Sequence, residues 1–159
     1  MKEIVIISGK GGTGKTSVAA ALAFIVPKAV MADCDVDAAD LHLILKPEIR
    51  TSEDFYSGVK AEIDPGMCIG CWECERVCRF NAISHASSIY KVNPLDCEGC
   101  GYCNQICPAQ AISLPQQMVG QCFVSDTRFG CRLVHAKLGI GADNSGKLVA
   151  KVKKEAKQE

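Results

Sequence analysis

The hydrophobic pattern of the first part of the chain alternates between strand and helix signals. Residues 4–7 form a continuous apolar run, residues 17–26 have helical composition, and residues 29–35 form a second strand-like run. A strand, a helix and a strand in this order predict a parallel βαβ unit. Pro27 ends the predicted helix, and Pro47 ends the segment after the second run. This region therefore predicts part of an α/β domain.

The pattern changes character between residues 64 and 115. Turn residues mark both places, Asp64-Pro65-Gly66 at the start and Leu114-Pro115 at the end, and they predict domain boundaries. An internal repeat lies between them, because residues 68–84 and residues 97–113 are identical at 8 of 17 positions. We therefore expect residues 64–115 to form a small inserted domain.

The last part of the chain returns to strand and helix patterns. Residues 118–127 and 131–139 predict two short strands, and residues 147–157 predict an amphipathic helix. The expected organisation is an α/β domain that begins with residues 1–63, is interrupted by the insert, and resumes incompletely over residues 116–159.

Composition narrows the class of protein. The chain has 159 residues, of which 48% are hydrophobic with the cysteines included, and this share is ordinary for a globular protein in water. No apolar run approaches the roughly 20 residues that span a membrane. The run at residues 4–7 is followed by glycines and by no small-residue cleavage site, which argues against a signal peptide. We expect a cytoplasmic protein without a membrane span.

The 18 basic and 18 acidic residues are unevenly distributed. Residues 116–159 hold 8 basic and 4 acidic residues, but five of the basic residues are lysines of the terminal segment GKLVAKVKKEAKQE. A solvated helix face explains this excess better than a nucleic-acid site. No nucleic-acid partner is expected.

Residues 9–16 read G-K-G-G-T-G-K-T and satisfy the G-x-x-x-x-G-K-[ST] pattern of phosphate-binding loops. Glycines let backbone N–H groups turn toward phosphates, and the helix that follows adds a favourable partial charge. Lys15 is expected to reach the β- and γ-phosphates of ATP as a catalytic residue, and the Thr16 hydroxyl to bind Mg²⁺. The alternative is a glycine-rich turn without a ligand. The expected nucleotide-binding residues are Gly11, Gly12, Thr13, Gly14, Lys15, Thr16 and Ser17.

The loop carries a second lysine, Lys10, ahead of the glycines. In this it resembles the deviant Walker A motif of the MinD, ParA and Mrp group of P-loop ATPases. The resemblance implies that Lys10 contacts the nucleotide of the partner subunit in a homodimer; the alternative is a solvated lysine. It also implies that Asp35 orients the attacking water and that Asp33 assists at the metal. Asp37 and Asp40 are expected to cap the next helical turn.

The chain has 11 cysteines, an unusual number for a cytoplasmic protein, in which disulfides are rare and metal or cluster binding is the usual role. Eight of them follow the spacing C-x-x-C-x-x-C-x-x-x-C, which occurs twice. This is the ferredoxin pattern for two 4Fe-4S clusters, in which the fourth cysteine of each run binds the other cluster. The predicted ligand sets are Cys68, Cys71, Cys74 and Cys107 for one cluster, and Cys97, Cys100, Cys103 and Cys78 for the other.

Zinc is the competing metal, because paired C-x-x-C turns also build zinc ribbons. A zinc ribbon, however, needs neither the third cysteine of each run nor the crossed fourth. Cys34, Cys122 and Cys131 remain and are expected to be buried structural thiols. All three histidines are expected to be structural or surface residues. Trp72 and Tyr102 are expected to shield sulfur from water.

Together, the two motifs resemble MinD superfamily P-loop ATPases that contain an inserted ferredoxin domain, over essentially the whole chain. The resemblance implies an α/β fold: a partial P-loop NTPase with a mostly parallel sheet, and an inserted α+β bacterial 2[4Fe-4S] ferredoxin-like domain. It extends to residues 125–130 and 144–149, as a strand and a helix of the ATPase. About 109 residues remain outside the insert, few for an ATPase domain, and no D-x-P-P-G motif is present. We expect ATP hydrolysis near background.

Three functions compete at this stage. The first is an ATP-binding iron–sulfur protein that couples nucleotide state to electron transfer with a redox partner protein. The second is a ferredoxin-type electron carrier, or a cluster carrier, in which the phosphate loop is a non-hydrolysing remnant. The third is a positioning ATPase that acts on a membrane or on DNA, and the lysines of the terminal segment are its only support.

Overall fold

The structure is a computed structural model in which residues 2–26, 28–36, 38–86, 89–139 and 145–159 are described. It divides into two units. Met1–Phe55 and Val119–Glu159 form the first, which we call the sheet unit. Tyr56–Met118 form the second, which we call the cysteine unit.

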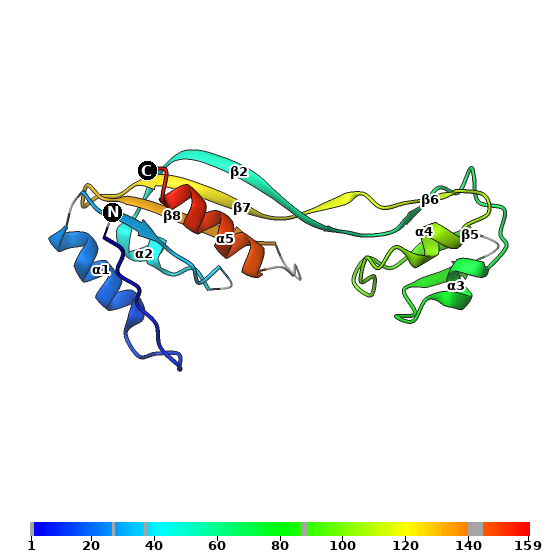
Figure 1. The fold of residues 1–159 in the computed structure, drawn as a ribbon, viewed down its shortest axis with the longest axis horizontal. Coiled ribbons are helices and arrows are strands. Elements are labelled where there is room, and N and C mark those ends of the chain that lie inside the picture. Colours follow the sequence, from blue (N-terminus) through cyan, green and yellow to red (C-terminus); the bar gives the residue numbers. More distant parts are fainter. Residues whose placement is uncertain (1, 27, 37, 87–88, 140–144) are drawn as a thin grey trace. The chain divides into compact units, whose positions relative to one another are not determined.

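The sheet unit is built on four strands in the order β1-β8-β7-β2 (Figure 1). Their bounds are β1 Val30–Ala32, β2 Glu48–Val59, β7 Gln116–Asp126 and β8 Arg132–Leu138. β1 runs parallel to β8, and β7 runs antiparallel to it. The sheet is therefore mixed rather than mostly parallel as predicted, because a short turn joins β7 directly to β8 and such a turn imposes antiparallel pairing.

The core of the sheet unit lies on both faces of β8, whose residues 133–136 are all buried. On one face, Val134 and Ala136 pack with Leu148 and Val152 of the helix α5 (Ser145–Ala156). On the other face, Leu133 packs with residues of the helices α1 (Lys15–Ile25) and α2 (Leu41–Leu45). A strand covered on both faces is apolar along most of its length, and residues 133–136 read Leu-Val-His-Ala, in which the buried His135 interrupts the apolar run.

Most predicted elements of the sheet unit are confirmed: the helix at residues 17–26, the strands at 29–35, 118–127 and 131–139, and the helix at 147–157. The strand predicted at residues 4–7 is wrong. These residues form no strand, and Ile4 and Ile7 are 76% and 84% exposed. A continuous apolar run becomes a strand only when a neighbour pairs with it and both faces are covered. In the described part of the chain no strand pairs with it.

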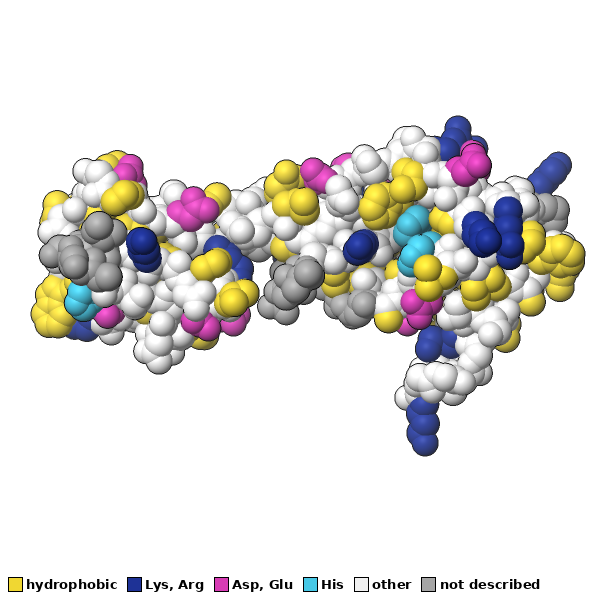
Figure 2. Space-filling model, turned by 180° about the vertical axis from the view of Figure 1, so that it is seen from behind, with side chains coloured by type: hydrophobic (Ala, Val, Ile, Leu, Met, Phe, Trp, Pro, Cys, Tyr) yellow, Lys and Arg dark blue, Asp and Glu magenta, His cyan; other side chains and the backbone are white. Residues whose placement is uncertain are grey.

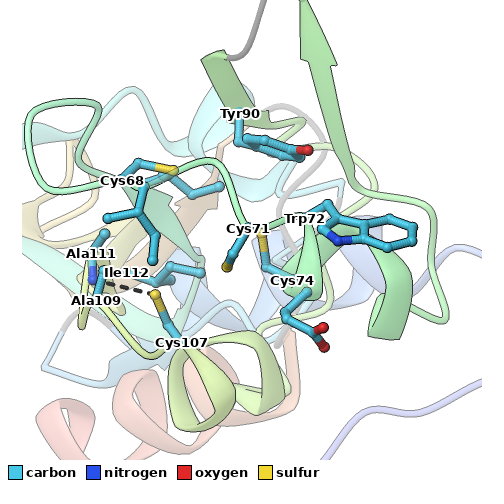
Figure 3. Close-up of a pocket in the computed structure, with 12 residues that line it drawn as sticks. Cys68, Cys71, Trp72, Cys74, Tyr90, Cys107, Ala109, Ala111 and Ile112 are labelled. Atoms are coloured by element: carbon cyan, nitrogen blue, oxygen red, sulfur yellow. Dashed lines mark hydrogen bonds between the residues drawn. The ribbon is translucent and has the colours of Figure 1, made fainter.

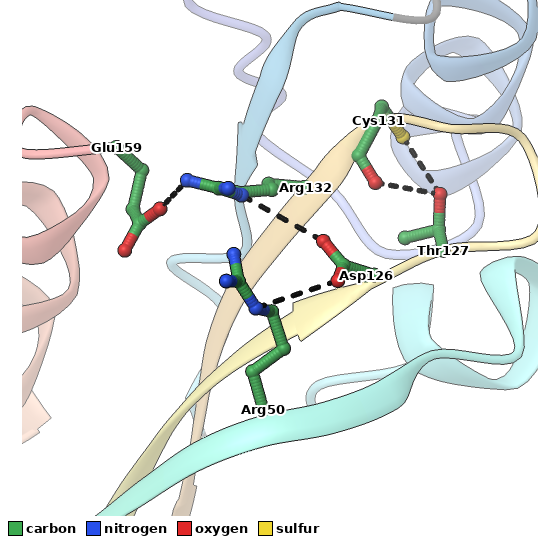
Figure 4. A network of polar contacts seen from close by, with 6 residues as sticks. All are labelled: Arg50, Asp126, Thr127, Cys131, Arg132 and Glu159. Atoms are coloured by element: carbon green, nitrogen blue, oxygen red, sulfur yellow. Dashed lines mark hydrogen bonds and ion pairs between the residues drawn. The ribbon is translucent and has the colours of Figure 1, made fainter.

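The turn between β7 and β8 is closed by its own side chains (Figure 4). The Thr127 hydroxyl donates to the Cys131 carbonyl oxygen at 2.8 Å, and the Gly130 N–H donates to the Thr127 carbonyl oxygen at 3.0 Å. Residues 125–130, predicted as a strand of an ATPase fold, are thus the end of β7 and this turn. Beside it, Asp126 pairs with Arg50 at 3.4 Å and Arg132 at 3.6 Å.

The cysteine unit consists of short elements in two similar halves. β3 (Glu62–Ile63) pairs with β6 (Ile112–Ser113), and β4 (Ile83–Ala86) pairs with β5 (Ile89–Val92), both antiparallel. One short helix stands in each half, α3 (Glu73–Val77) and α4 (Tyr102–Ile106). Strands of two to four residues bury little apolar surface, so this unit has a small core made of Ala61, Cys74, Ile83, Tyr90 and Ile112.

No helix among the described residues is long and apolar enough to cross a membrane. Hydrophobic side chains reach the surface of both units on the face drawn in Figure 2. Scattered exposed apolar residues are normal for folded proteins, and only grouped ones require an explanation.

Candidate iron-sulfur site

The two cysteine runs fold in the same way. In each run a residue with left-handed backbone conformation stands between the second and third cysteines and begins the helix: Trp72 with φ 59° and Gly101 with φ 77°. The fourth cysteine of each run ends the helix in an extended conformation, with φ of −72° at Cys78 and −71° at Cys107. The sequence repeat is therefore a structural repeat.

The first pocket of the cysteine unit is lined by four cysteines, namely Cys68, Cys71, Cys74 and Cys107, and Figure 3 shows them around a common space. Three of them come from the first run and the fourth comes from the second. Apolar residues complete the lining, among them Ile63, Tyr90 and Ile112. The free space, including the part open to solvent, measures about 330 Å³.

The second pocket repeats this arrangement with the halves exchanged. Its cysteines are Cys97, Cys100, Cys103 and Cys78, and its free space on the same measure is about 390 Å³. Gly99 lies in the loop between two of these cysteines, with φ 65°, and a Cβ there would overlap the Val59 carbonyl oxygen. Only glycine fits at that point of the loop.

Backbone N–H groups point at the sulfurs of three cysteines. The Ala82 N–H donates to Cys78 Sγ at 3.4 Å, and the Ala111 N–H donates to Cys107 Sγ at the same distance. The Ala61 N–H donates to Cys97 Sγ at 3.5 Å. Donors of this kind stabilise negative charge on sulfur and tune the potential of a cluster bound there.

These donors were not predicted from the sequence, although a signal for two of them is present. Ala82 and Ala111 stand four positions after the last cysteine of each run and are identical in the two halves. They are 2% and 3% exposed, so the packing of the unit encloses both residues.

Burial raises the pKa of the Cys74 thiol to about 11; the Glu75 N–H opposes this rise, and the thiols of Cys103, Cys68 and Cys71 add to it. Burial likewise raises the pKa of Cys103. Without a bound group these thiols therefore keep their protons at neutral pH. A cofactor that binds their thiolates must displace those protons.

The arrangement fits a cluster better than a single ion. Within the described residues, no three His, Cys, Asp or Glu side chains are close enough together to hold one metal ion. Each pocket nevertheless gathers four thiols, the donor set of a [4Fe-4S] cluster. Sulfurs that surround a wider space suit a cofactor with four iron atoms more than they suit tetrahedral zinc.

Comparison with known families agrees with this geometry. Residues 61–114 match the family model of the 4Fe-4S dicluster domain. The chain thus contains an iron–sulfur ferredoxin-like region, and the match together with the cysteines supports [4Fe-4S] clusters as its cofactors.

The whole chain is similar to a protein of Methanocaldococcus jannaschii that bears the name Uncharacterized protein MJ0578. The two are 38% identical over an alignment of 159 positions, which covers 98% of this chain and 55% of the relative. The chain spans about half the length of this curated relative. These findings support the iron–sulfur region, and they support neither a P-loop ATPase fold nor ATP and Mg²⁺ as cofactors.

The predicted phosphate loop lies in the sheet unit. Residues 9–14 form turns, Gly12 and Gly14 have φ of 74° and 91°, and α1 begins at Lys15. The Lys15 ammonium donates to the Ser8 hydroxyl at 3.1 Å, and the Thr13 hydroxyl donates to the Lys10 carbonyl oxygen at 3.2 Å. The helix that the motif requires is present, whereas the strand before it is missing.

The predicted loop side chains differ in exposure. Lys10 and Ser17 are exposed, and Lys15 and Thr16 are partly buried. Of the glycines, Gly11 and Gly12 are exposed and Gly14 is partly buried.

The aspartates predicted to assist hydrolysis occupy the segment between β1 and α2. Asp33 accepts hydrogen bonds from the Asp35 N–H at 3.1 Å and from the Leu41 N–H, at the start of α2, at 3.3 Å. Burial, the largest effect, raises the pKa of Asp33 despite these bonds. Asp40 is the N-cap residue immediately before α2, but its side chain makes no capping bond, and Asp33 accepts the bond from the first helical N–H instead. Asp37 lies outside the described residues.

Asp35 is exposed, and among the described residues no hydrogen bond or ion pair joins its side chain to the phosphate loop. The structure thus brings the cysteines together in two groups of four, whereas among the described residues it shows no hydrogen bond or ion pair between Asp35 and Lys10 or Lys15.

The remaining cysteines and histidines behave largely as predicted. Cys122 and Cys131 are 4% and 1% exposed, and Cys34 is partly buried beside the core that contains Cys122. His135 is buried on β8, where its ring stacks on those of Phe123 and His42.

Proposed function

We propose that the chain transfers electrons through two [4Fe-4S] clusters, as a ferredoxin-type carrier. One cluster is assigned to Cys68, Cys71, Cys74 and Cys107, and the other to Cys97, Cys100, Cys103 and Cys78. The observation that supports this assignment most strongly is the crossing of the fourth cysteine, because each pocket takes three cysteines from one run and one from the other. A bound [4Fe-4S] cluster supplies one-electron redox chemistry.

The residues of the chain hold and tune this centre. The eight cysteines bind as thiolates, and the N–H groups of Ala61, Ala82 and Ala111 donate to three of them. Ile63, Tyr90 and Ile112 give the first pocket an apolar wall that limits access of water. Restricted water and a fixed number of sulfur donors are the means by which a protein sets a cluster potential.

The test is anaerobic reconstitution followed by iron, sulfide and zinc analysis and EPR of the reduced protein. We expect about eight iron and eight sulfide ions per chain, the content of two such clusters. Cys107→Ala should remove the first cluster and leave the second, whereas Cys78→Ala should do the reverse. Cys122→Ala, a buried thiol outside both pockets, is the matched control and should keep both. Stoichiometric zinc with no sulfide would refute the proposal.

A second candidate is coupling of nucleotide state to electron transfer. The observation that favours it is the helix start at Lys15 directly after the left-handed Gly12 and Gly14, which leaves backbone N–H groups at a helix N-terminus available for phosphate. On this proposal Lys15, Thr16 and Ser17 hold MgATP and Asp35 orients water. Lys10 then reaches the nucleotide of a second subunit in a cytoplasmic homodimer.

This second candidate is tested by adding MgATP to the reduced holoprotein and following EPR line shape and ATP binding. Binding that is lost in Lys15→Ala, with a changed line shape, would support coupling. No binding by the intact protein would refute it, and the electron carrier would then stand alone.

A further inference from the structure

The first half of the cysteine unit holds a polar pair that the second half lacks. Glu75 Oε2 on α3 lies 2.9 Å from His85 Nδ1 on β4. The residues at the matching positions of the second half are Asn104 and Leu114. The Asn104 side-chain amide donates to the Ile112 carbonyl oxygen instead. The repeat thus contains its own comparison, because a side chain that can take up a proton in the first half has a neutral counterpart in the second.

His85 is separated from the first pocket by one side chain, that of Tyr90. The two residues stand directly opposite each other where β4 pairs with β5, and their ring centroids are 5.2 Å apart. Tyr90 is 8% exposed and forms part of the pocket wall beside the first three cysteines of the first run (Figure 3). Burial raises the pKa of Tyr90, and Glu75 followed by the same three thiols adds to the rise. Tyr90 therefore lies close both to the polar pair and to the thiols that are assigned to the first cluster.

The polar pair is also open to water. The side chain of His85 is 53% exposed, and that of Glu75 is 34% exposed. The other charged residues of α3, Glu73 and Arg76, are paired with each other. Lys91 of β5 lies on the opposite face of the two strands from His85, because side chains alternate along a strand. Histidine in ordinary surroundings changes charge between pH 5 and 8, so water can supply a proton to this ring in that range.

We propose that His85 takes up a proton when the cluster in the first pocket gains an electron, and that reduction in the second pocket involves no such proton. This rests on the proposed electron transfer. The electron comes from a one-electron donor protein, and the proton comes from water. An ionised carboxylate only accepts hydrogen bonds, so Glu75 keeps the proton of the neutral ring on Nδ1, and the second proton enters at Nε2. The imidazolium then partly offsets the added negative charge, which makes the first pocket easier to reduce in acid.

The experiment measures both reduction potentials of the reconstituted holoprotein by voltammetry between pH 5 and pH 8.5. We expect one potential to rise as the pH falls and the other to stay constant. The rise should correspond to about a threefold change in the reduction equilibrium, which is roughly 28 mV for one electron. His85→Gln should make both potentials independent of pH. His42→Gln, which removes a histidine of the sheet unit, is the matched control and should leave the slope as it is in the wild type.

Glu75→Gln is a second variant, which keeps a hydrogen-bonding side chain beside His85 but removes the charge that favours the imidazolium. The pH-dependent region should therefore move to lower pH in this variant, an effect that a merely structural role would not produce. Two potentials that do not change with pH in the wild type, or a slope that survives in His85→Gln, would overturn the coupling alone. A reconstituted protein that holds both clusters and accepts no electrons would instead overturn the proposed function.

Discussion

The sheet unit and the cysteine unit are each stabilised by a different kind of interaction. In the sheet unit, β8 is covered on both faces by aliphatic side chains, and Leu133, Val134, Leu148 and Val152 are fully buried. In the cysteine unit the core is one small cluster, and the side chains packed against it are largely cysteines of the two pockets. Apolar burial stabilises the first unit by itself, whereas the second depends on whatever those thiols bind.

The largest expected effect follows from removing the clusters. Chelation of iron from the holoprotein should abolish protection from hydrogen exchange over residues 56–118, because this small core has little else to stabilise it. Protection in β8 and α5 should persist. Peptide-resolved hydrogen exchange of holoprotein and apoprotein measures both, and equal loss in the two units would show that they do not differ in this way.

The second effect acts on the sheet unit alone. Leu133→Ala should lower the free energy of unfolding of the sheet unit by about 2–5 kcal/mol, since it opens a cavity between β8 and the helices α1 and α2. Leu43→Ala is the matched control, because Leu43 is 63% exposed. Iron content should be unchanged in both. Urea denaturation followed in the far ultraviolet reports the difference, and a loss below 1 kcal/mol would contradict the packing described.

Acid should weaken the sheet unit through His135. Burial, followed by the nearby His42, lowers the pKa of His135 from 6.5 to about 4. Between these values the unfolded chain binds a proton that the folded chain does not. Stability is therefore complete above about pH 6.5 and falls as the pH decreases toward 4, by roughly 3 kcal/mol in all.

The measurement is unfolding free energy against pH for the wild type, His135→Gln, and the control His85→Gln in the cysteine unit. His135→Gln should flatten the acid slope, and His85→Gln should leave it unchanged. A slope that survives in His135→Gln would assign the acid sensitivity to another group.

The smallest effect concerns the polar network at the end of the sheet. Asp126→Asn removes the ion pairs with Arg50 and Arg132, but the Asp126 side chain is 58% exposed. Exposed pairs contribute little, so the loss should stay below about 1 kcal/mol and shrink in high salt. Thermal unfolding at two salt concentrations tests this, and a salt-independent loss above that limit would indicate a structural role.

The cysteine sets could be predicted from spacing because cluster binding constrains spacing directly. The helix α5 could be predicted because burial of one face imposes a period, and the strand β8 could be predicted because most of its residues are apolar. β2 could not, because residues 48–54 are all exposed and include Glu48, Arg50 and Glu53, so no apolar alternation marks them. This strand is held by main-chain pairing with β7 and by polar contacts such as Lys151 to Glu53 at 2.7 Å.

The prediction of a strand at residues 4–7 was wrong for the opposite reason: the apolar pattern is present, but the strand is not. This run has the composition of a buried strand, but composition does not supply the neighbour with which a strand must pair. Trp72 was also beyond prediction, because a backbone angle cannot be read from composition. Its comparison with Gly101 in the second half was the available signal.

The crossing of the fourth cysteines also determines the order in which the two pockets receive their last cysteine during synthesis of the chain. As the chain is made from its N-terminus, the second pocket has all its cysteines once Cys103 has been added. The first pocket begins earlier, at Cys68, yet remains one thiol short until Cys107. The site that starts first is therefore completed last.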